Sequence, residues 1–432
     1  MSNITRRNFI KVAAGMTAAS MTSCSICPPT PTGKKRVVVI GGGVGGATAA
    51  KYIRKADPSI EVTLIEQNKH YYTCFMSNEV LGGVRSLESI KFSYDGLLKR
   101  GVKVVYDLAT GIDPNTKNVT TQSGATFCYD RLVVSPGIDF KWNAIEGYDK
   151  SVAEKIPHAW RNSLQTITLR KQLESMKNGG NVIIAVPPRP FRCHPAPFER
   201  ASQIAHYLKH HKPKSKILIL VANDTFAEQK LFIQGWEKLY GYGTDNSIIE
   251  WVPFSEGGKV VRVDAKEMTI YAGEFEDEYV GDVINFIPAQ TAGKIAFIAD
   301  LVDKTGWCPV NHKTFESERH PDIHVIGDAN TAMSRAAHSA NSQAKVCAIA
   351  VVKALQGGEE MGSPYYMTAC YSVLGEDYGI SLSAVYHLEG DKIALIKGAG
   401  GYSPMDATPE VRKREVLYAH SWFKNITNDI FG

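Results

Sequence analysis

Apolar and polar positions near the start of the chain fall into blocks with the lengths of strands and helices. An apolar run, Val37-Val38-Val39-Ile40, is followed by a glycine-rich turn over residues 41–46. Ala47 to Ala56 reads as a helix, and a second apolar run over residues 62–65 ends in Glu66. Short apolar runs bounded by turn residues are typical of buried strands. The pattern therefore predicts a strand, a tight turn, a helix and a second strand.

The turn has the spacing G-x-G-x-x-G, with glycines at Gly41, Gly43 and Gly46. Gly41 permits the tight turn, Gly43 lets the backbone approach a pyrophosphate, and Gly46 lets the helix pack close to the strand. The helix N-terminus then directs its positive dipole end at the phosphates. Glu66, at the end of the second strand, can accept hydrogen bonds from a ribose hydroxyl. These features predict a dinucleotide site, against the plainer alternative of a glycine-rich turn in an ordinary α/β domain.

The later pattern predicts a second unit of the same type. A helix over 165–176 and a strand over 182–186 are followed by a helix over 201–209 and a strand over 216–221. Where a nucleotide-binding glycine turn is expected, the sequence has Pro187-Pro188, and proline has no N–H to offer a pyrophosphate. This unit is expected to have the fold of an NAD(P)H domain without binding NAD(P)H.

The chain then returns to the first unit. An apolar strand over 283–287 leads back, and a further strand over 323–326 ends in Gly327-Asp328, a second flavin-domain signature. We also expect helices over 88–100 and 344–355 and a β-hairpin over 119–127. The predicted fold is α/β, with two dinucleotide-binding-like domains, as in glutathione-reductase-like flavoproteins, and a C-terminal α+β domain. The expected boundaries are 34–147 with 288–359, 148–287 and 360–432.

Residues 1–33 are expected to be an export signal and linker. Thr5 to Lys11 contains the twin arginines Arg6-Arg7 before a mildly apolar stretch, which resembles a Tat signal for export of folded proteins. This predicts a periplasmic protein; a basic, unstructured N-terminus is the alternative. Cys24 and Cys27 lack the following histidine of a c-type haem site, so we expect no haem on this chain.

Charge and composition argue against three further classes of function. The net charge of +5 is small for 432 residues and unclustered, which disfavours nucleic acid as a partner. No apolar run is long enough for a membrane span. The scattered cysteines do not suit a metal site.

Several separate segments together resemble the flavoprotein subunit of flavocytochrome c sulfide dehydrogenases. The matching segments are Tyr71-Tyr72-Thr73-Cys74, Phe191-Arg192-Cys193, Glu199-Arg200-Ala201-Ser202, Gly306-Trp307-Cys308-Pro309-Val310, His324-Val325-Ile326-Gly327-Asp328, Ser339-Ala340-Asn341-Ser342-Gln343 and Cys370-Tyr371-Ser372. His194 and Ala196 depart from the family pattern beside the active cysteine.

The resemblance implies a periplasmic heterodimer with a c-type cytochrome subunit that carries the haem, and it implies sulfide as the substrate. It implies FAD bound through a thioether at the position of Cys74. It further implies a redox disulfide at the positions of Cys193 and Cys370, with an acid at Glu199. On this hypothesis hydrosulfide attacks the disulfide by thiol–disulfide exchange, and two electrons pass to FAD.

Each assignment has an alternative. Cys74 could be a buried free thiol, Cys193 and Cys370 a structural disulfide or two buried thiols, and Glu199 an acid at a helix N-terminus. Cys128, Cys308 and Cys347 are expected to be packing residues. The rival functions are a sulfide:quinone oxidoreductase, an NAD(P)H-dependent disulfide or ferredoxin reductase, and a non-catalytic flavin-binding subunit. A quinone enzyme needs an amphipathic membrane anchor, and residues 411–432 are expected to have little apolar face.

Overall fold

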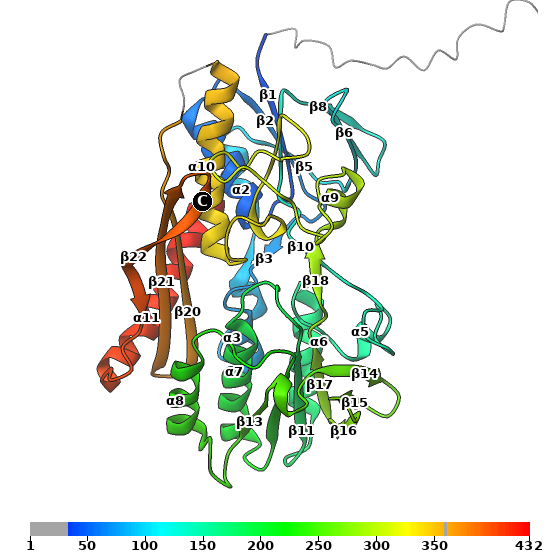
Figure 1. Ribbon diagram of the computed structural model, residues 1–432, viewed down its shortest axis with the longest axis vertical. Coiled ribbons are helices and arrows are strands. Elements are labelled where there is room, and N and C mark those ends of the chain that lie inside the picture. Colours follow the sequence, from blue (N-terminus) through cyan, green and yellow to red (C-terminus); the bar gives the residue numbers. More distant parts are fainter. Residues whose placement is uncertain (1–32, 162, 358–360) are drawn as a thin grey trace, which may run out of the picture.

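The computed structural model describes residues 33–161, 163–357 and 361–432, and the predicted export signal with Cys24 and Cys27 lies outside them. Two parallel sheets are stacked along the long axis of the molecule, and a third, antiparallel sheet lies beside them (Figure 1). The two parallel sheets confirm the predicted α/β fold class.

The first sheet has five parallel strands in the order β19-β9-β1-β2-β5. Their bounds are β1 Arg36–Ile40, β2 Glu61–Ile65, β5 Lys103–Val105, β9 Arg131–Val134 and β19 Ile323–Val325. Helix α2 (Val44–Ala56) packs against α10 (Ala337–Gln356), in the upper half of Figure 1. Most residues of these strands are apolar and buried, because both sheet faces are covered.

The second sheet has four parallel strands in the order β13-β12-β11-β17. The bounds are β11 Asn181–Val186, β12 Lys216–Val221, β13 Ile249–Val252 and β17 Val283–Phe286, with helices α6 Ser163–Ser175, α7 Ala196–His211 and α8 Gln229–Tyr240. An antiparallel pair, β10 (Ile138–Phe140) with β18 (Gln290–Ala292), carries the chain between the two sheets. The prolines predicted to replace a glycine turn follow β11 directly.

The C-terminal part is a three-stranded antiparallel sheet with one long helix. The bounds are β20 Tyr366–Gly375, β21 Tyr378–Glu389, β22 Lys392–Tyr402 and α11 Pro409–Phe431. The expectation that residues 411–432 have little apolar face is wrong. Val416, Ala419, Phe423, Ile426 and Ile430 recur at helical spacing and are buried. Charged residues between them conceal this stripe in the sequence.

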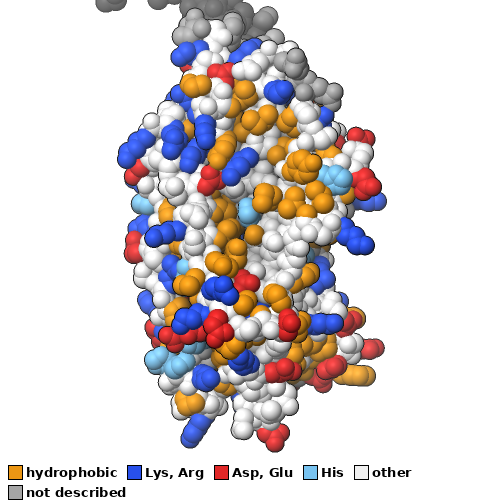
Figure 2. Space-filling model, turned by 90° about the vertical axis from the view of Figure 1, so that its left-hand side faces the viewer, with side chains coloured by type: hydrophobic (Ala, Val, Ile, Leu, Met, Phe, Trp, Pro, Cys, Tyr) orange, Lys and Arg blue, Asp and Glu red, His pale blue; other side chains and the backbone are white. Residues whose placement is uncertain are grey.

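This part forms the left-hand side of Figure 1, which faces the viewer in Figure 2. Exposed apolar side chains on these elements include Met367, Leu395, Tyr402, Leu417 and Tyr418. Figure 2 shows apolar side chains spread over this face between lysine, arginine and acidic side chains.

Shorter elements complete the chain. They are β3 Tyr71–Tyr72, α3 Ser77–Gly82, η1 Leu87–Ile90, β4 Lys91–Phe92, α4 Asp95–Lys99, β6 Ala109–Asp113, β7 Asn118–Thr121, β8 Thr126–Cys128, α5 Val152–Lys155, η2 Phe254–Glu256, β14 Val260–Asp264, β15 Thr269–Ala272, β16 Asp277–Val280, α9 Lys294–Ile298 and η3 Gly327–Ala329. The predicted helix over 88–100 is wrong, because Lys91-Phe92 pairs with Tyr71-Tyr72 and divides it. The predicted hairpin over 119–127 is confirmed by the pairing of β7 with β8.

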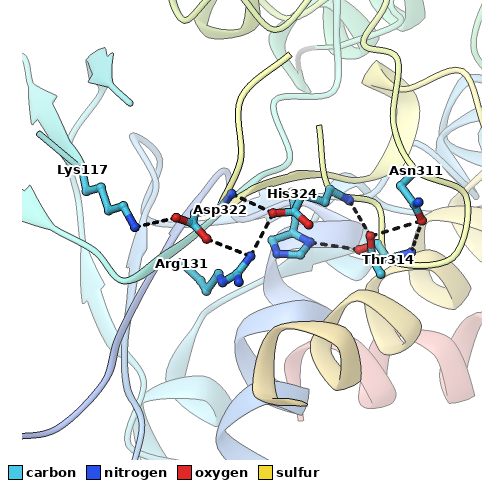
Figure 3. Close-up of polar contacts among 7 residues, drawn as sticks. Lys117, Arg131, Asn311, Thr314, Asp322 and His324 are labelled. Atoms are coloured by element: carbon cyan, nitrogen blue, oxygen red, sulfur yellow. Dashed lines mark hydrogen bonds and ion pairs between the residues drawn. The ribbon is translucent and has the colours of Figure 1, made fainter. Parts of the chain in front are cut away.

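A polar network holds the entry to β19, the strand that precedes Gly327 (Figure 3). Asp322 accepts from Lys117 and lies 3.0 Å from Nη1 of Arg131. The same Arg131 atom donates to Glu316 Oε1 at 2.9 Å, and Glu316 accepts from the backbone N–H of Asp322. His324 Nδ1 lies 2.9 Å from the Thr314 carbonyl oxygen. The network fixes where β19 begins, and so where its far end presents Gly327 and Asp328.

Within the described ranges, no helix is long and apolar enough to cross a membrane. The described residues also contain no group of three or more His, Cys, Asp or Glu side chains placed to hold a metal ion.

Candidate active site

The carboxyl ends of the first sheet's strands meet at one edge. Gly41 follows β1, Glu66 follows β2, Ser135 follows β9, and Gly327 lies just beyond β19. In open parallel sheets, ligands bind outside the carboxyl ends of the strands, at the point where the strand order reverses. The structure therefore brings together the glycine turn, Glu66 and Gly327-Asp328, which the sequence predicts as parts of one dinucleotide site.

The glycines of the turn are required by contact geometry. Gly41 has φ +94°, and a Cβ there would lie 2.3 Å from the Ser135 carbonyl oxygen. A Cβ at Gly46 would lie 1.9 Å from the Gly41 carbonyl oxygen. At Gly43, by contrast, only the Tyr71 ring would come within 4 Å, at 3.5 Å. A side chain at Gly41 or Gly46 would therefore clash with the protein backbone. The space beside Gly43 is open, and a phosphate is expected there.

Glu66 holds the turn in place from the second strand. Its Oε2 accepts from the Gly42 N–H at 2.7 Å, and its Oε1 accepts from the Asn68 backbone N–H at 2.8 Å. Helix α2 begins after Gly43, with no side chain capping its N-terminus. These residues fit the adenosine and pyrophosphate half of a dinucleotide.

Gly327 and Asp328 form the opposite side of this edge. Gly327 has φ +79°, and its N–H donates to Gln343 Oε1 at 2.9 Å. Asp328 is half-buried, and its Oδ2 lies 3.9 Å from Nη1 of Arg192. Burial raises the pKa of the Asp328 carboxyl, while Arg192 and Arg335 oppose the rise.

Cys74 lies between β3 and α3 as a half-buried free thiol. Burial raises its pKa, and Arg192 acts in the opposite direction. Tyr71 is in electrostatic range of Cys74, Glu66 and Asp328. Cys74 therefore lies near Arg192 and Asp328, at the same edge of the first sheet as the predicted FAD-binding residues.

Cys193 lies in the loop that replaces the glycine turn of the second sheet. Its backbone is in the left-handed region (φ 57°), and its N–H donates to the Arg335 carbonyl oxygen at 2.8 Å. Arg335 Nε in turn donates to the Asp328 carbonyl oxygen at 3.0 Å. Arg335 thereby ties the Cys193 loop to the end of the first sheet.

Cys193 and Cys370 come together although they are far apart in the sequence. Both are half-buried free thiols. Burial raises the pKa of Cys193 well above its usual value; nearby Cys370, Cys74 and Glu199 raise it further, and Arg192 lowers it. Burial also raises the pKa of Cys370 to about 12, with Glu228 and Glu199 adding to the rise.

Glu199 lies in the first turn of α7 and connects three elements. Its Oε1 accepts from the Val373 N–H of β20 at 3.0 Å, and its Oε2 accepts from Asn78 Nδ2 of α3 at 2.7 Å. Burial raises the pKa of Glu199 to about 7, against these two hydrogen bonds. A carboxyl that titrates near neutrality can take up and release protons beside the two cysteines.

Three residues of the site were not singled out from the sequence. Arg192 is the cation among Cys74, Cys193 and Asp328, and its position next to Cys193 was the available signal. Arg335 joins the two sheets across the site. Glu228 lies beside Cys370, and nothing in its local sequence indicates burial.

The other described cysteines divide into two groups. Cys308 and Cys347 are completely buried free thiols, as expected for packing residues. Cys128 is disulfide-bonded, so its assignment as a packing residue is wrong. It lies half-buried at the end of β8.

Models of known protein families match most of the chain. Residues 166–288 match the central domain of the flavoprotein chain of sulfide dehydrogenase (flavocytochrome c), and residues 362–431 match the flavin-binding domain of flavocytochrome c sulfide dehydrogenase. Residues 35–184 match the pyridine nucleotide-disulphide oxidoreductases.

Individual relatives agree with these matches. The flavoprotein chain of sulfide dehydrogenase (flavocytochrome c) from Chlorobaculum thiosulfatiphilum is 62% identical over 48 residues, which are 11% of this chain and 100% of that sequence. A mitochondrial sulfide:quinone oxidoreductase from Dictyostelium discoideum is 23% identical over 72% of this chain and 69% of its own. The crystal structure of the Aquifex aeolicus sulfide:quinone oxidoreductase has the same fold (TM-score 0.71, 19% identity, 92% of each chain). The chain belongs to the family of flavocytochrome c sulfide dehydrogenase flavoprotein chains.

Proposed function

We propose that this chain oxidises sulfide at the Cys193–Cys370 pair and passes the electrons through FAD to a c-type cytochrome subunit in the periplasm. As a member of its family the chain is a sulfide-oxidising flavoprotein oxidoreductase that uses FAD. The cysteine chemistry, the covalent flavin link, the acceptor and the compartment are the proposed parts. The observation that carries the proposal is the meeting of Cys193, Cys370 and Glu199 beside the Cys74 side of the dinucleotide site.

The glycine turn, Glu66 and Gly327-Asp328 would hold FAD, with Cys74 as its covalent anchor. The bound flavin would supply a two-electron acceptor that can also release electrons singly to a haem. The contacts that favour this assignment are the open space at Gly43 and the position of Cys74 near Asp328.

The chain's own residues would carry the sulfur chemistry. The two cysteines would form the disulfide that an anionic hydrosulfide attacks by thiol–disulfide exchange. Arg192, close to Cys193, favours an anion there. Glu199 would hold a proton, because its pKa lies near neutrality and both its oxygens point at the elements that carry Asn78 and Cys370.

Two features support a cytochrome over a quinone as acceptor. The twin-arginine pattern predicts export to the compartment of soluble c-type cytochromes. The apolar stripe of α11 is covered by α3 and the C-terminal sheet, where Val416 and Phe423 pack against Met76, Val80 and Val373, so it is not free to enter a bilayer. Use of NAD(P)H is disfavoured, because Pro187-Pro188 follows β11 where a pyrophosphate needs N–H groups.

Anaerobic reduction of the purified holoprotein tests the cysteine role. Sulfide should bleach the flavin absorbance of the wild type, and Cys193→Ser and Cys370→Ser should keep the flavin but lose this bleaching. Cys347→Ala, at a buried cysteine of α10 outside the site, is the matched control and should behave as the wild type. Normal bleaching in Cys193→Ser would refute the role of the pair.

The acceptor is tested by offering the sulfide-reduced protein two oxidants, and NADH is offered separately to the oxidised protein. Reoxidation by a c-type cytochrome and not by decyl-ubiquinone is expected. The opposite preference would favour a sulfide:quinone oxidoreductase, and bleaching of the oxidised flavin by NADH would favour a pyridine-nucleotide reductase.

A further inference from the structure

Glu228 is a buried carboxyl, and the residue is 9% exposed. Among the residues that the structure describes, neither its Oε1 nor its Oε2 has a hydrogen-bonding partner. Burying an unpaired carboxyl is costly, so such groups call for a specific explanation. The backbone at Glu228 is in the left-handed region (φ 54°), and its carbonyl oxygen accepts from Leu231 and Phe232 at the start of α8. The backbone therefore holds this side chain at a defined place.

The surroundings of Glu228 are apolar on one side and reactive on the other. The rings of Phe198, Phe226, Phe232 and Trp236 cluster between α7 and α8. Helices α7 and α8 both pack against β20, which carries Cys370. Glu199 of α7 raises the pKa of Glu228, and Glu228 raises the pKa of Cys370, so the three groups lie near one another. Arg189 donates to the carbonyl oxygen of Thr225, three residues before Glu228, at 3.0 Å. Glu228 thus has a thiol and a second carboxyl as its titratable neighbours.

The two carboxyls beside Cys370 are held differently. Glu199 accepts an N–H on each oxygen, which favours its ionised form and fixes its orientation. Glu228 accepts none, and burial with the nearby Glu199 raises its pKa to about 7. Glu228 is therefore the carboxyl that can carry a proton at neutral pH without breaking an existing hydrogen bond.

The two sulfurs share Glu199 as a neighbour, which raises the pKa of both, and differ in the other charged group nearby. At Cys193 the guanidinium of Arg192 opposes the rise and attracts an anion. Cys370 lies near Glu228 and Glu199, which repel an anion when ionised and supply a proton when neutral. Leaving as an unprotonated thiolate is unfavourable for a sulfur in this position, because a thiol of high pKa is a poor leaving group.

We propose, building on the proposed function, that hydrosulfide bonds to Cys193 and that Cys370 leaves with a proton supplied by Glu228. The new bond joins the substrate sulfur to Cys193, and the Cys193–Cys370 bond breaks with its electron pair on Cys370. Glu228 protonates Cys370, and the carboxylate regains a proton from the S–H of the new persulfide. The net change is hydrosulfide plus disulfide to a Cys193 persulfide anion, beside Arg192, and a Cys370 thiol. Glu199 remains the second carboxyl that can carry a proton in this site, and its hydrogen bond from the Val373 N–H also ties α7 to β20.

The location of the persulfide tests the direction of attack in the wild-type holoprotein. Oxidised protein is mixed anaerobically with sulfide, quenched with iodoacetamide and digested for mass spectrometry. The extra sulfur is expected on the Cys193 peptide, with plain carbamidomethylation on the Cys370 peptide. Extra sulfur on the Cys370 peptide overturns the inference alone. No added sulfur on either peptide, together with an unbleached flavin, overturns the proposed function and this inference with it.

The variant Glu228→Gln tests the proton transfer. At pH 7 the rate of persulfide formation should fall by about 10-fold, which is less than the roughly 100-fold or more typical of general acid–base catalysis, because Glu199 remains. Glu237→Gln, an exposed position on the same helix, is the matched control and should keep the wild-type rate. Rates are compared at equal hydrosulfide concentration at each pH, because hydrogen sulfide itself titrates near neutrality. A wild-type rate and pH profile in a folded, flavin-loaded Glu228→Gln protein overturns the role of Glu228.

Discussion

Replacing Glu228 by Gln should change how the stability of the protein depends on pH, whether or not the protein turns over sulfide. Burial raises the pKa of Glu228 from 4.5 to about 7. Each unit of pKa difference between the folded and unfolded states corresponds to about 1.4 kcal/mol. The folded state holds the proton more tightly, so the stability that Glu228 contributes is present below pH 4.5 and is lost as pH rises to 7. The loss is about 3 kcal/mol, and glutamine, which does not ionise, should not show it.

Urea unfolding of the flavin-loaded wild type and variant at several pH values measures this difference. The free energy of unfolding of Glu228→Gln, relative to the wild type, should increase by about 3 kcal/mol between pH 4.5 and pH 8 and then level off. Glu237→Gln is the control and should differ from the wild type by a small amount, since Glu237 is exposed. A constant difference for Glu228→Gln across the pH range would refute the claim that this carboxyl is buried without a partner.

Three further changes test the flavin site and its support. Gly46→Ala should abolish flavin binding, because the new Cβ would lie 1.9 Å from the Gly41 carbonyl oxygen; a variant purified with a full flavin complement would contradict this. Cys74→Ser should keep FAD bound in the folded protein but release it on acid denaturation, and intact mass with FAD still attached would disprove the thioether. Arg200→Met should lower the urea midpoint of unfolding by an amount equivalent to about 3 kcal/mol. The reason is that Arg200 is buried and its loss leaves the Ala159 carbonyl oxygen without its 2.7 Å donor. An unchanged midpoint would show that the site repacks.

Local sequence was sufficient for the first dinucleotide unit. The glycine spacing, the apolar strands and Glu66 predict a turn that the structure contains, with Glu66 bonded to the Gly42 N–H. Local patterns predicted the wrong structure for two segments whose structure depends on other parts of the chain or whose apolar residues are spread between charged ones. Lys91-Phe92 is a strand because Tyr71-Tyr72 pairs with it, and α11 has an apolar face that its interspersed charges conceal.

In the candidate site too, some residues could be found from the sequence and others only from the structure. Resemblance to a family marked Cys193, Cys370 and Glu199, but no local pattern marks Glu228, whose neighbours in the sequence have the composition of a surface loop. Arg335 likewise shows its role only in three dimensions, where its carbonyl oxygen accepts from Cys193 and its guanidinium bonds the Asp328 backbone.

The sequence by itself determined the family and the dinucleotide-binding turn, because these depend on residue types at fixed short spacings. Only the tertiary structure decided which charges surround each sulfur. Arg192 lies next to Cys193 along the chain, whereas Glu199 and Glu228 reach Cys370 through the packing of α7 and α8 against β20. Burial and charge act through space, so the pKa of each group depends on residues that the sequence places far apart.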